Sequence, residues 1–167
     1  YLLHWRGQHP LEETVEAFER LREQGKIKRW GVSNFDVDDL RELHNPDCAT
    51  NQVLYNPAQR GIEFDLLPWC EKRALPTMAY CPLAQAGRLL QHPVLAEIAE
   101  RHGATPAQVS LAWVTRDDGV IAIPKAVAPE HVRLNAAAGA LTLTGEDLRA
   151  IDRAFPAPTR KQRLAMV

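Results

Sequence analysis

The sequence predicts an α/β fold of the (β/α)8 TIM-barrel type, of which it would supply about five consecutive β/α units. Short apolar runs alternate with helical patterns five times along the chain, which indicates parallel strands with right-handed crossovers. The runs are mostly apolar throughout, as expected for strands covered on both faces. The alternative is a doubly wound, nucleotide-binding sheet, but the nine glycines never form a GxGxxG turn.

The first two β/α units are predicted from apolar spacing and from one capping residue. The opening run YLL predicts a strand over 1–3, and apolar residues at helical spacing then predict a helix over 11–24. The next apolar run predicts a strand over 27–32. A helix over 36–43 should follow and begin at Asp36, because an aspartate there can accept hydrogen bonds from the first free amides.

The middle of the chain repeats the same order. An apolar run predicts a strand over 49–54, and a helix is predicted over about 63–73. A further strand is predicted over 76–79. Residues 81–93 carry two prolines and a glycine, so we expect a long loop there.

The last third contains more helix than strand. Pro106 suits a first helical turn because its missing N–H costs nothing there, and Thr144 suits an N-cap. The proline-rich, basic tail 156–167 is expected to be solvated, with closure over the pocket as the alternative. The elements predicted before it are helix 94–102, helix 106–115, strand 119–124, helix 129–138 and helix 144–155.

Bulk composition excludes several classes of function. The 167 residues suit one domain, 1–167, and a net charge of -1 gives no case for a nucleic-acid or membrane-surface partner. The three cysteines form no CxxC pair, so we expect a reducing, cytoplasmic location and no metal site. No apolar stretch is long enough to span a bilayer.

The start of the sequence suggests a longer protein. The first methionine is Met78, and the chain opens directly on an apolar run. A complete barrel has eight strands and typically about 250 residues. We therefore expect this to be the C-terminal portion of a barrel protein without its N-terminal strands. The outer strands of such a fragment would be open edges, through which it could self-associate.

Polar or aromatic side chains lie at or near the carboxyl end of each predicted strand, where parallel barrels place their ligands. Amide side chains suit a planar carboxamide because they present a donor and an acceptor together. An aromatic face suits stacking on a flat ring, and a lysine suits a phosphate. Together they predict a nicotinamide dinucleotide site, formed by His4, Ser33, Asn34, Gln52, Tyr80 and Lys125.

Five segments resemble successive motifs of the aldo-keto reductase family, in the family's order. They are YLLHW, GKIKRWGVSNF, ATNQVLYN, MAYCPLA and AIPKAV, and they begin at the family's fourth barrel strand, so the chain would supply strands 4 to 8. LLHWRG, RGIEFDLLPWC and PLAQAGRL are similar to bacterial methylglyoxal reductase-type members. The resemblance implies NADPH-dependent reduction of aldehydes or ketones to alcohols, with methylglyoxal-like small aldehydes as candidate substrates.

The resemblance assigns the substrate and nicotinamide contacts to the first three strand ends. His4 matches the catalytic histidine that orients the substrate carbonyl, and Trp5 matches a pocket aromatic. The groups that hold the nicotinamide carboxamide correspond to Ser33, Asn34 and Gln52.

The remaining cofactor contacts are assigned to the last two strand ends. Tyr80 matches the tyrosine that stacks on the nicotinamide ring. The loop that crosses the pyrophosphate contains Cys81 and Leu83. Lys125 matches the lysine that pairs with the 2′-phosphate, and Asn135 matches an adenine contact.

Three positions depart from the family pattern. Cys81 replaces a serine, Ala126 replaces a serine or threonine, and His131 replaces the arginine that commonly grips the 2′-phosphate. A mostly neutral imidazole is a weaker phosphate partner than arginine. We still expect NADPH over NADH because of Lys125, but by a reduced margin.

The Asp, Tyr and Lys that act with the histidine in this family have no counterpart here, and Tyr1 and Tyr55 are not in matching motifs. The isolated chain is therefore expected to be inactive, whereas the intact protein would be a monomeric enzyme. One alternative is a non-catalytic NADPH-binding or regulatory protein of the same fold. Another is a barrel aldolase that uses Lys125 as a Schiff-base nucleophile.

Overall fold

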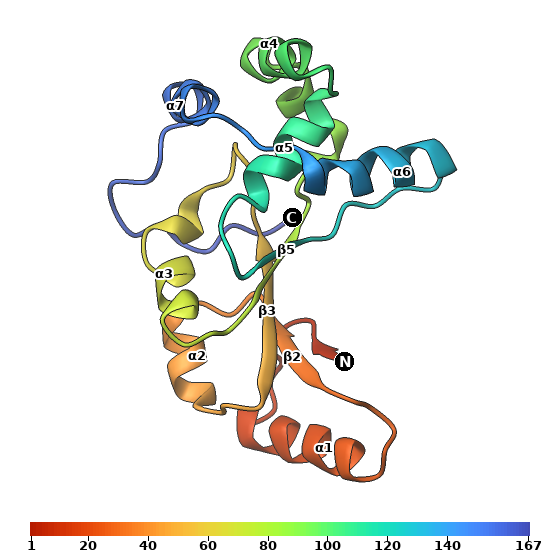
Figure 1. Cartoon of the computed structure of the whole chain (residues 1–167). Coiled ribbons are helices and arrows are strands. Elements are labelled where there is room, and N and C mark those ends of the chain that lie inside the picture. Colours follow the sequence, from red (N-terminus) through yellow and green to blue (C-terminus); the bar gives the residue numbers. More distant parts are fainter.

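The computed structural model describes residues 1–167 as one parallel sheet with helices around it (Figure 1). The strands are β1 (Leu2–Leu3), β2 (Trp30–Ser33), β3 (Cys48–Leu54), β4 (Thr77–Tyr80) and β5 (Val120–Ala122). The helices are α1 (Leu11–Glu23), α2 (Val37–Leu43), α3 (Leu66–Glu71), α4 (Pro93–His102), α5 (Pro106–Val114), α6 (Pro129–Ala137) and α7 (Gly145–Ala154). Four short 3-10 helices complete the chain: η1 (Gly61–Glu63), η2 (Ala84–Ala86), η3 (Arg88–Gln91) and η4 (Ala138–Ala140).

The sheet is the wall of a partial barrel. Its strands follow the order β1-β2-β3-β4-β5, and every neighbouring pair is parallel. Val53 and Ala79 pair in register on the helix-covered face and are completely buried. On the other face Met78 pairs with Ile121, and the Ile121 side chain is 48% exposed. The predicted fold class is confirmed, including the open edges, because β1 pairs only with β2 and β5 only with β4.

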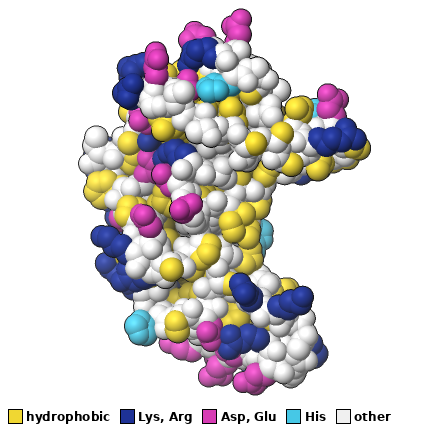
Figure 2. Space-filling model, viewed as in Figure 1, with side chains coloured by type: hydrophobic (Ala, Val, Ile, Leu, Met, Phe, Trp, Pro, Cys, Tyr) yellow, Lys and Arg dark blue, Asp and Glu magenta, His cyan; other side chains and the backbone are white.

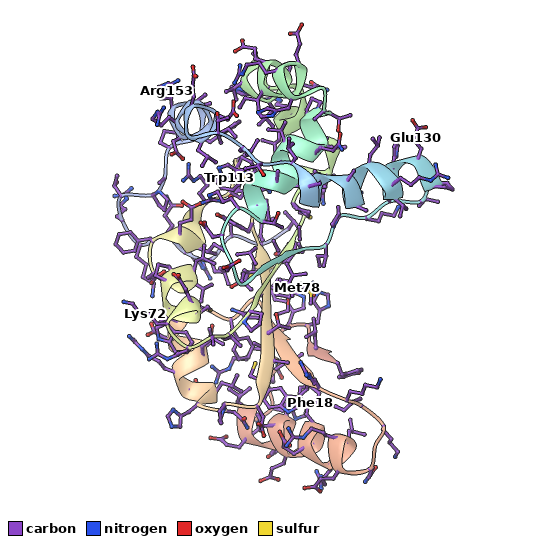
Figure 3. All side chains as sticks on the ribbon, in the orientation of Figure 1. Phe18, Lys72, Met78, Trp113, Glu130 and Arg153 are labelled. Carbon is purple, nitrogen blue, oxygen red and sulfur yellow. The ribbon has the colours of Figure 1, made fainter.

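The uncovered face of the sheet lies in a hollow between α6 and the part of the molecule that carries α1 (Figure 2). Figure 3 shows Met78 at the middle of the sheet, with Glu130 near the far end of the arm that α6 forms. No residue of α6 is buried, and even its apolar Val132 side chain is 51% exposed. The inner wall of the barrel is therefore largely uncovered in this chain, and α6 contacts only its sequence neighbours α5 and η4 closely without burying any residue of its own.

Two predicted boundaries are wrong for identifiable reasons. The second strand begins at Trp30 rather than at residue 27, because the amides of Lys26 and Ile27 both donate to the carbonyl of Leu21 at the end of α1. The helix predicted over 63–73 is divided into η1 and the shorter α3. Glu63 in η1 forms two ion pairs, with Arg60 at 2.8 Å and with Arg116, which follows α5, at 3.2 Å.

Both predicted helix caps are present as reciprocal capping boxes. At the start of α2 the Asp36 carboxylate accepts hydrogen bonds from the amides of Asp38 (2.8 Å) and Asp39 (3.0 Å). The Asp39 carboxylate in turn accepts one from the Asp36 amide at 3.0 Å. Thr144 and Asp147 repeat this arrangement at the start of α7.

The C-terminal tail is exposed over most of its length, as predicted, but two of its residues tie it to the rest of the fold. Lys161 Nζ lies 3.3 Å from a carboxylate oxygen of Asp65 and 3.7 Å from one of Asp38. Leu164 packs against the hydrophobic core. In Figure 1 the tail returns from α7 to the sheet, and the C-terminus lies near the ends of the central strands. The path of the tail agrees with the alternative prediction as well, because it passes the strand ends while most of its side chains stay exposed.

Asp147 is a buried carboxylate that joins α7 to α4. It is 1% exposed, and its oxygens accept hydrogen bonds from Arg101 Nη2 (2.5 Å) and Thr144 Oγ1 (2.7 Å), with His102 Nε2 at 2.8 Å. Burial alone would raise the pKa of Asp147, but these hydrogen bonds outweigh burial and hold it well below its ordinary value. Its ionised form therefore stabilises the folded state.

We predict that Asp147→Asn lowers the free energy of unfolding by about 1–3 kcal/mol at neutral pH, because it weakens a buried charged hydrogen-bond network. The wild-type contribution is present above the unfolded-state pKa of about 3.9 and is lost as pH falls below it. Urea unfolding of both proteins at several pH values tests this. Equal stability at neutral pH, or a difference that grows as the solution is acidified, would contradict it.

Candidate functional site

The carboxyl ends of β2 and β3 are tied together by polar contacts. Ser33 is buried, and its Oγ donates to the carbonyl of Gln52 at 2.8 Å. The backbone amide of Asn34 donates to the same carbonyl at 2.9 Å. These two hydrogen bonds fix where β2 opens into its loop, and the Gln52 side chain is half-buried beside them.

Asn34 links three strand ends through its side chain. Its Nδ2 donates to the carbonyl of His4 (3.3 Å) and contacts Ser33 Oγ (3.3 Å). Its Oδ1 accepts a hydrogen bond from the Tyr80 hydroxyl at 3.1 Å. The backbone of Asn34 is left-handed, with a φ of 61°, a conformation that asparagine adopts more readily than most residues. One amide thus brings together groups at the carboxyl ends of β1, β2 and β4.

Tyr80 presents a protonated phenol to this cluster. Burial raises the pKa of Tyr80, while a nearby hydrogen bond from the Val167 amide acts in the opposite direction. The net shift is upward, so the hydroxyl stays protonated at neutral pH and donates to Asn34. The contact with Val167 also brings the end of the tail to the edge of the candidate site.

His4 and Trp5 lie exposed directly after β1. Their ring centroids are 5.7 Å apart and tilted by 38°, and Trp5 is 45% exposed. The His4 side chain makes no hydrogen bond within the chain, so both ring nitrogens are free to meet a ligand. Arg6 fixes the loop that follows, through ion pairs with Asp39 (3.2 Å) and Glu42 on α2.

The remaining predicted residues occupy two separate places. Cys81 and Leu83 lie in the loop directly after Tyr80, within the same strand-end region. Lys125 is exposed three residues beyond β5, and His131 is exposed in the first turn of α6. Asn135 lines a groove of about 410 Å³ between α5, β5 and α6. The residues at the ends of β1 to β4 therefore lie together around Asn34, whereas Lys125, His131 and Asn135 lie separately, beyond β5 and on α6.

Tyr55 is not an alternative catalytic acid. It is completely buried, and burial raises the pKa of its phenol well above the ordinary value. Its hydroxyl donates to Glu63 at 2.7 Å and accepts a hydrogen bond from Arg116 at 2.9 Å. The Arg116 guanidinium also stacks on Trp113 at 3.9 Å. This network lies within the packed interior and ties the segment after β3 to α5.

Two buried polar residues next to the site were missed by the sequence reasoning. Asn56 and Ser110 hydrogen-bond the backbone of the loop after β4. Ser110 lies in the otherwise apolar run VSLAWV, and a lone hydroxyl in such a run indicates a buried hydrogen bond. Asn56 could have been singled out as a turn-forming residue before a proline.

A partial parallel barrel with hydrogen-bonding groups gathered at its carboxyl ends is the architecture of an α/β-barrel protein with a ligand site at that edge. Residues 1–155 match the model of the aldo/keto reductase family. The chain belongs to this family, as its motifs predicted.

Individual relatives agree with this assignment. The chain is 53% identical to methylglyoxal reductase YeaE of Escherichia coli, over 100% of the chain and 62% of that protein. It is 37% identical to glyoxal reductase of Bacillus subtilis, over 91% of the chain and 55% of that protein. An aldo-keto reductase from Klebsiella pneumoniae, solved in complex with NADPH, superimposes with a TM-score of 0.98 at 57% identity, covering 100% of the chain and 62% of that structure. The chain thus spans less than two thirds of the length of these relatives.

Proposed function

We propose that this chain is the cofactor-binding part of an NADPH-dependent carbonyl reductase and carries its catalytic histidine. The observation that supports this best is the cluster around Asn34, where an amide, a phenol and a serine hydroxyl meet at the ends of neighbouring strands. Such groups suit a planar carboxamide, and the Tyr80 ring beside them suits stacking on nicotinamide. The NADPH complex of the Klebsiella pneumoniae relative supports the same cofactor.

The 2′-phosphate of the cofactor is assigned to the exposed Lys125, with His131 and Asn135 on α6 beside the adenosine. His4, with Trp5 next to it, would orient the carbonyl of an aldehyde or ketone. Small dicarbonyls such as methylglyoxal are the substrate class we propose, because relatives at 53% and 37% identity are named for methylglyoxal and glyoxal. The three cysteines are free, which is consistent with a reducing, cytoplasmic location.

Carbonyl reduction should also need groups beyond these 167 residues. When bound, NADPH supplies the hydride, and a general acid must protonate the resulting alkoxide oxygen. The buried Tyr55 cannot serve as that acid, and Tyr80 already donates to Asn34. We therefore propose that the chain binds cofactor by itself and reduces carbonyls only with a segment that supplies the family's Asp, Tyr and Lys.

The direct test adds methylglyoxal and NADPH to the purified chain, alone and together with such a segment, and follows NADPH oxidation. Turnover only in the combined sample supports the proposal. NADPH binding without turnover in either sample would favour the alternative, a non-catalytic NADPH-binding or regulatory protein. Borohydride trapping of a carbonyl on Lys125 would instead favour the aldolase alternative.

We predict that Tyr80→Leu weakens NADPH binding about 10-fold, because stacking of a base on an aromatic ring contributes about 1–3 kcal/mol. NADH binding should fall by the same factor, since both cofactors carry the same ring. Tyr80→Phe keeps the ring and serves as the matched control, with a change of about threefold or less. Fluorescence titration of the three proteins tests this, and an equal loss in both variants would rule out stacking as the role of Tyr80.

A further inference from the structure

The loop after β4 has an unusual backbone. Cys81, Ala84, Gln85 and Ala86 all adopt positive φ angles, between 47° and 57°, and none of them is glycine. A left-handed conformation costs a non-glycine residue on the order of 1 kcal/mol, so four within six residues require support from the surrounding structure. The loop begins next to Tyr80, at the edge where the candidate site lies.

Two completely or almost completely buried side chains from other elements provide that support. Ser110 on α5 is 0% exposed, and its hydroxyl donates to the carbonyl of Pro82 at 2.9 Å. Asn56, which follows β3 and is 1% exposed, donates from Nδ2 to the carbonyl of Cys81 at 2.9 Å. The Asn56 side chain is itself fixed, because its Oδ1 accepts a hydrogen bond from the amide of Ala58 at 3.0 Å.

The orientation of these carbonyls determines where the next amide points. The Pro82–Leu83 peptide is trans, and in a trans peptide the carbonyl oxygen and the following N–H point in opposite directions. Because the Pro82 carbonyl points toward Ser110 on α5, the Leu83 N–H points away from α5. The Leu83 amide has no hydrogen-bond partner in the chain, and neither does the amide of Gln85.

Free backbone amides in a rigid loop are suitable donors to an anionic oxygen. The anion available at this site is the pyrophosphate of the dinucleotide, so the inference rests on the function proposed above. We propose that Ser110 and Asn56 are positioning residues, which hold the loop after β4 so that the Leu83 amide donates a hydrogen bond to a phosphate oxygen of NADPH. Neither side chain would touch the cofactor, because both are buried beneath the loop.

The test compares two ligands on the Ser110→Ala variant of the purified chain. NADPH carries the pyrophosphate, whereas adenosine 2′-monophosphate carries only the part assigned to Lys125 and Asn135. Alanine has a higher helix propensity than serine, so α5 should form normally. We expect NADPH binding to weaken about 10-fold, the scale of one hydrogen bond to a charged oxygen. The affinity for adenosine 2′-monophosphate should stay unchanged.

Thr50→Val is the matched control. Its hydroxyl also donates to a proline carbonyl, that of Pro76 at 2.9 Å, but it does so at the opposite end of the sheet. This variant should bind both ligands as the wild type does. The inference is overturned if Ser110→Ala binds NADPH normally, or if it loses both ligands equally. A wild-type chain that binds adenosine 2′-monophosphate but not NADPH would also overturn it, whereas one that binds neither ligand would refute the proposed cofactor site itself.

Discussion

Replacing His4 with alanine should lower the turnover number for methylglyoxal by about 10²–10⁴-fold, measured on the chain together with the segment that supplies the Asp, Tyr and Lys. This is the usual contribution of a positioned side chain that exchanges a proton or hydrogen bond with the reacting group. The imidazole is free to contact the substrate, since the His4 side chain makes no hydrogen bond within the chain. NADPH affinity should change less than about twofold, because only the His4 backbone carbonyl belongs to the Asn34 cluster.

His9→Ala is the matched control, because His9 is an exposed histidine in the same loop and is not part of the candidate site. Its turnover should equal that of the wild type. If His4→Ala keeps wild-type turnover, or if it loses NADPH affinity in proportion to its activity, His4 is not the residue that orients the carbonyl.

Replacing Lys125 with methionine should weaken NADPH binding about 10- to 100-fold, because a hydrogen bond between charged groups contributes about 1.5–3 kcal/mol. NADH lacks the 2′-phosphate, so its affinity should change by less than about twofold. Methionine keeps most of the length of the lysine side chain and removes its charge. The loss should become smaller at high ionic strength, since Lys125 is exposed and its field is screened there.

Lys28→Met is the matched control, because Lys28 is an exposed lysine in the turn before β2 and is not one of the candidate site residues. Both cofactors should bind it as they bind the wild type. If Lys125→Met loses affinity for NADPH and NADH equally, Lys125 stabilises the α6 arm rather than contacting the 2′-phosphate. Unchanged NADPH affinity would show that Lys125 is not part of the site.

The architecture could be predicted from the sequence because local patterns determine it. Alternating apolar runs and helical spacing predict the five strands and the seven α-helices, and Asp36 and Thr144 mark two helix starts that the structure confirms. They do not predict the 3-10 helices, and η2 and η3 lie in the segment that was expected to be a loop. Boundaries failed where a tertiary contact decided them. The amides of Lys26 and Ile27 hydrogen-bond the end of α1 instead of joining a strand. Glu63 pairs with Arg60 and with the distant Arg116, and no local pattern shows the second contact.

The position of the candidate residues at the strand ends could be predicted from the sequence, but the hydrogen bonds that join them could not. Ser33, Asn34, Gln52 and Tyr80 were expected at neighbouring strand ends, and the structure places them there. No sequence pattern showed that the Asn34 side chain would join three strand ends, because that depends on its left-handed backbone. The supporting contacts of Ser110 and the return of the tail to Tyr80 also depend on segments distant in sequence.

The most direct test of the account is a fluorescence titration of the purified chain with NADPH, with NADH titrated in parallel. The account predicts saturable binding of both cofactors, with NADPH bound more tightly, because the residues proposed to hold the nicotinamide already meet around Asn34 and the proposed phosphate contact of Lys125 is specific to NADPH. Binding of NADH as tightly as NADPH would contradict the role of Lys125. The absence of any saturable binding would contradict the central claim, that these 167 residues form the cofactor site of the reductase.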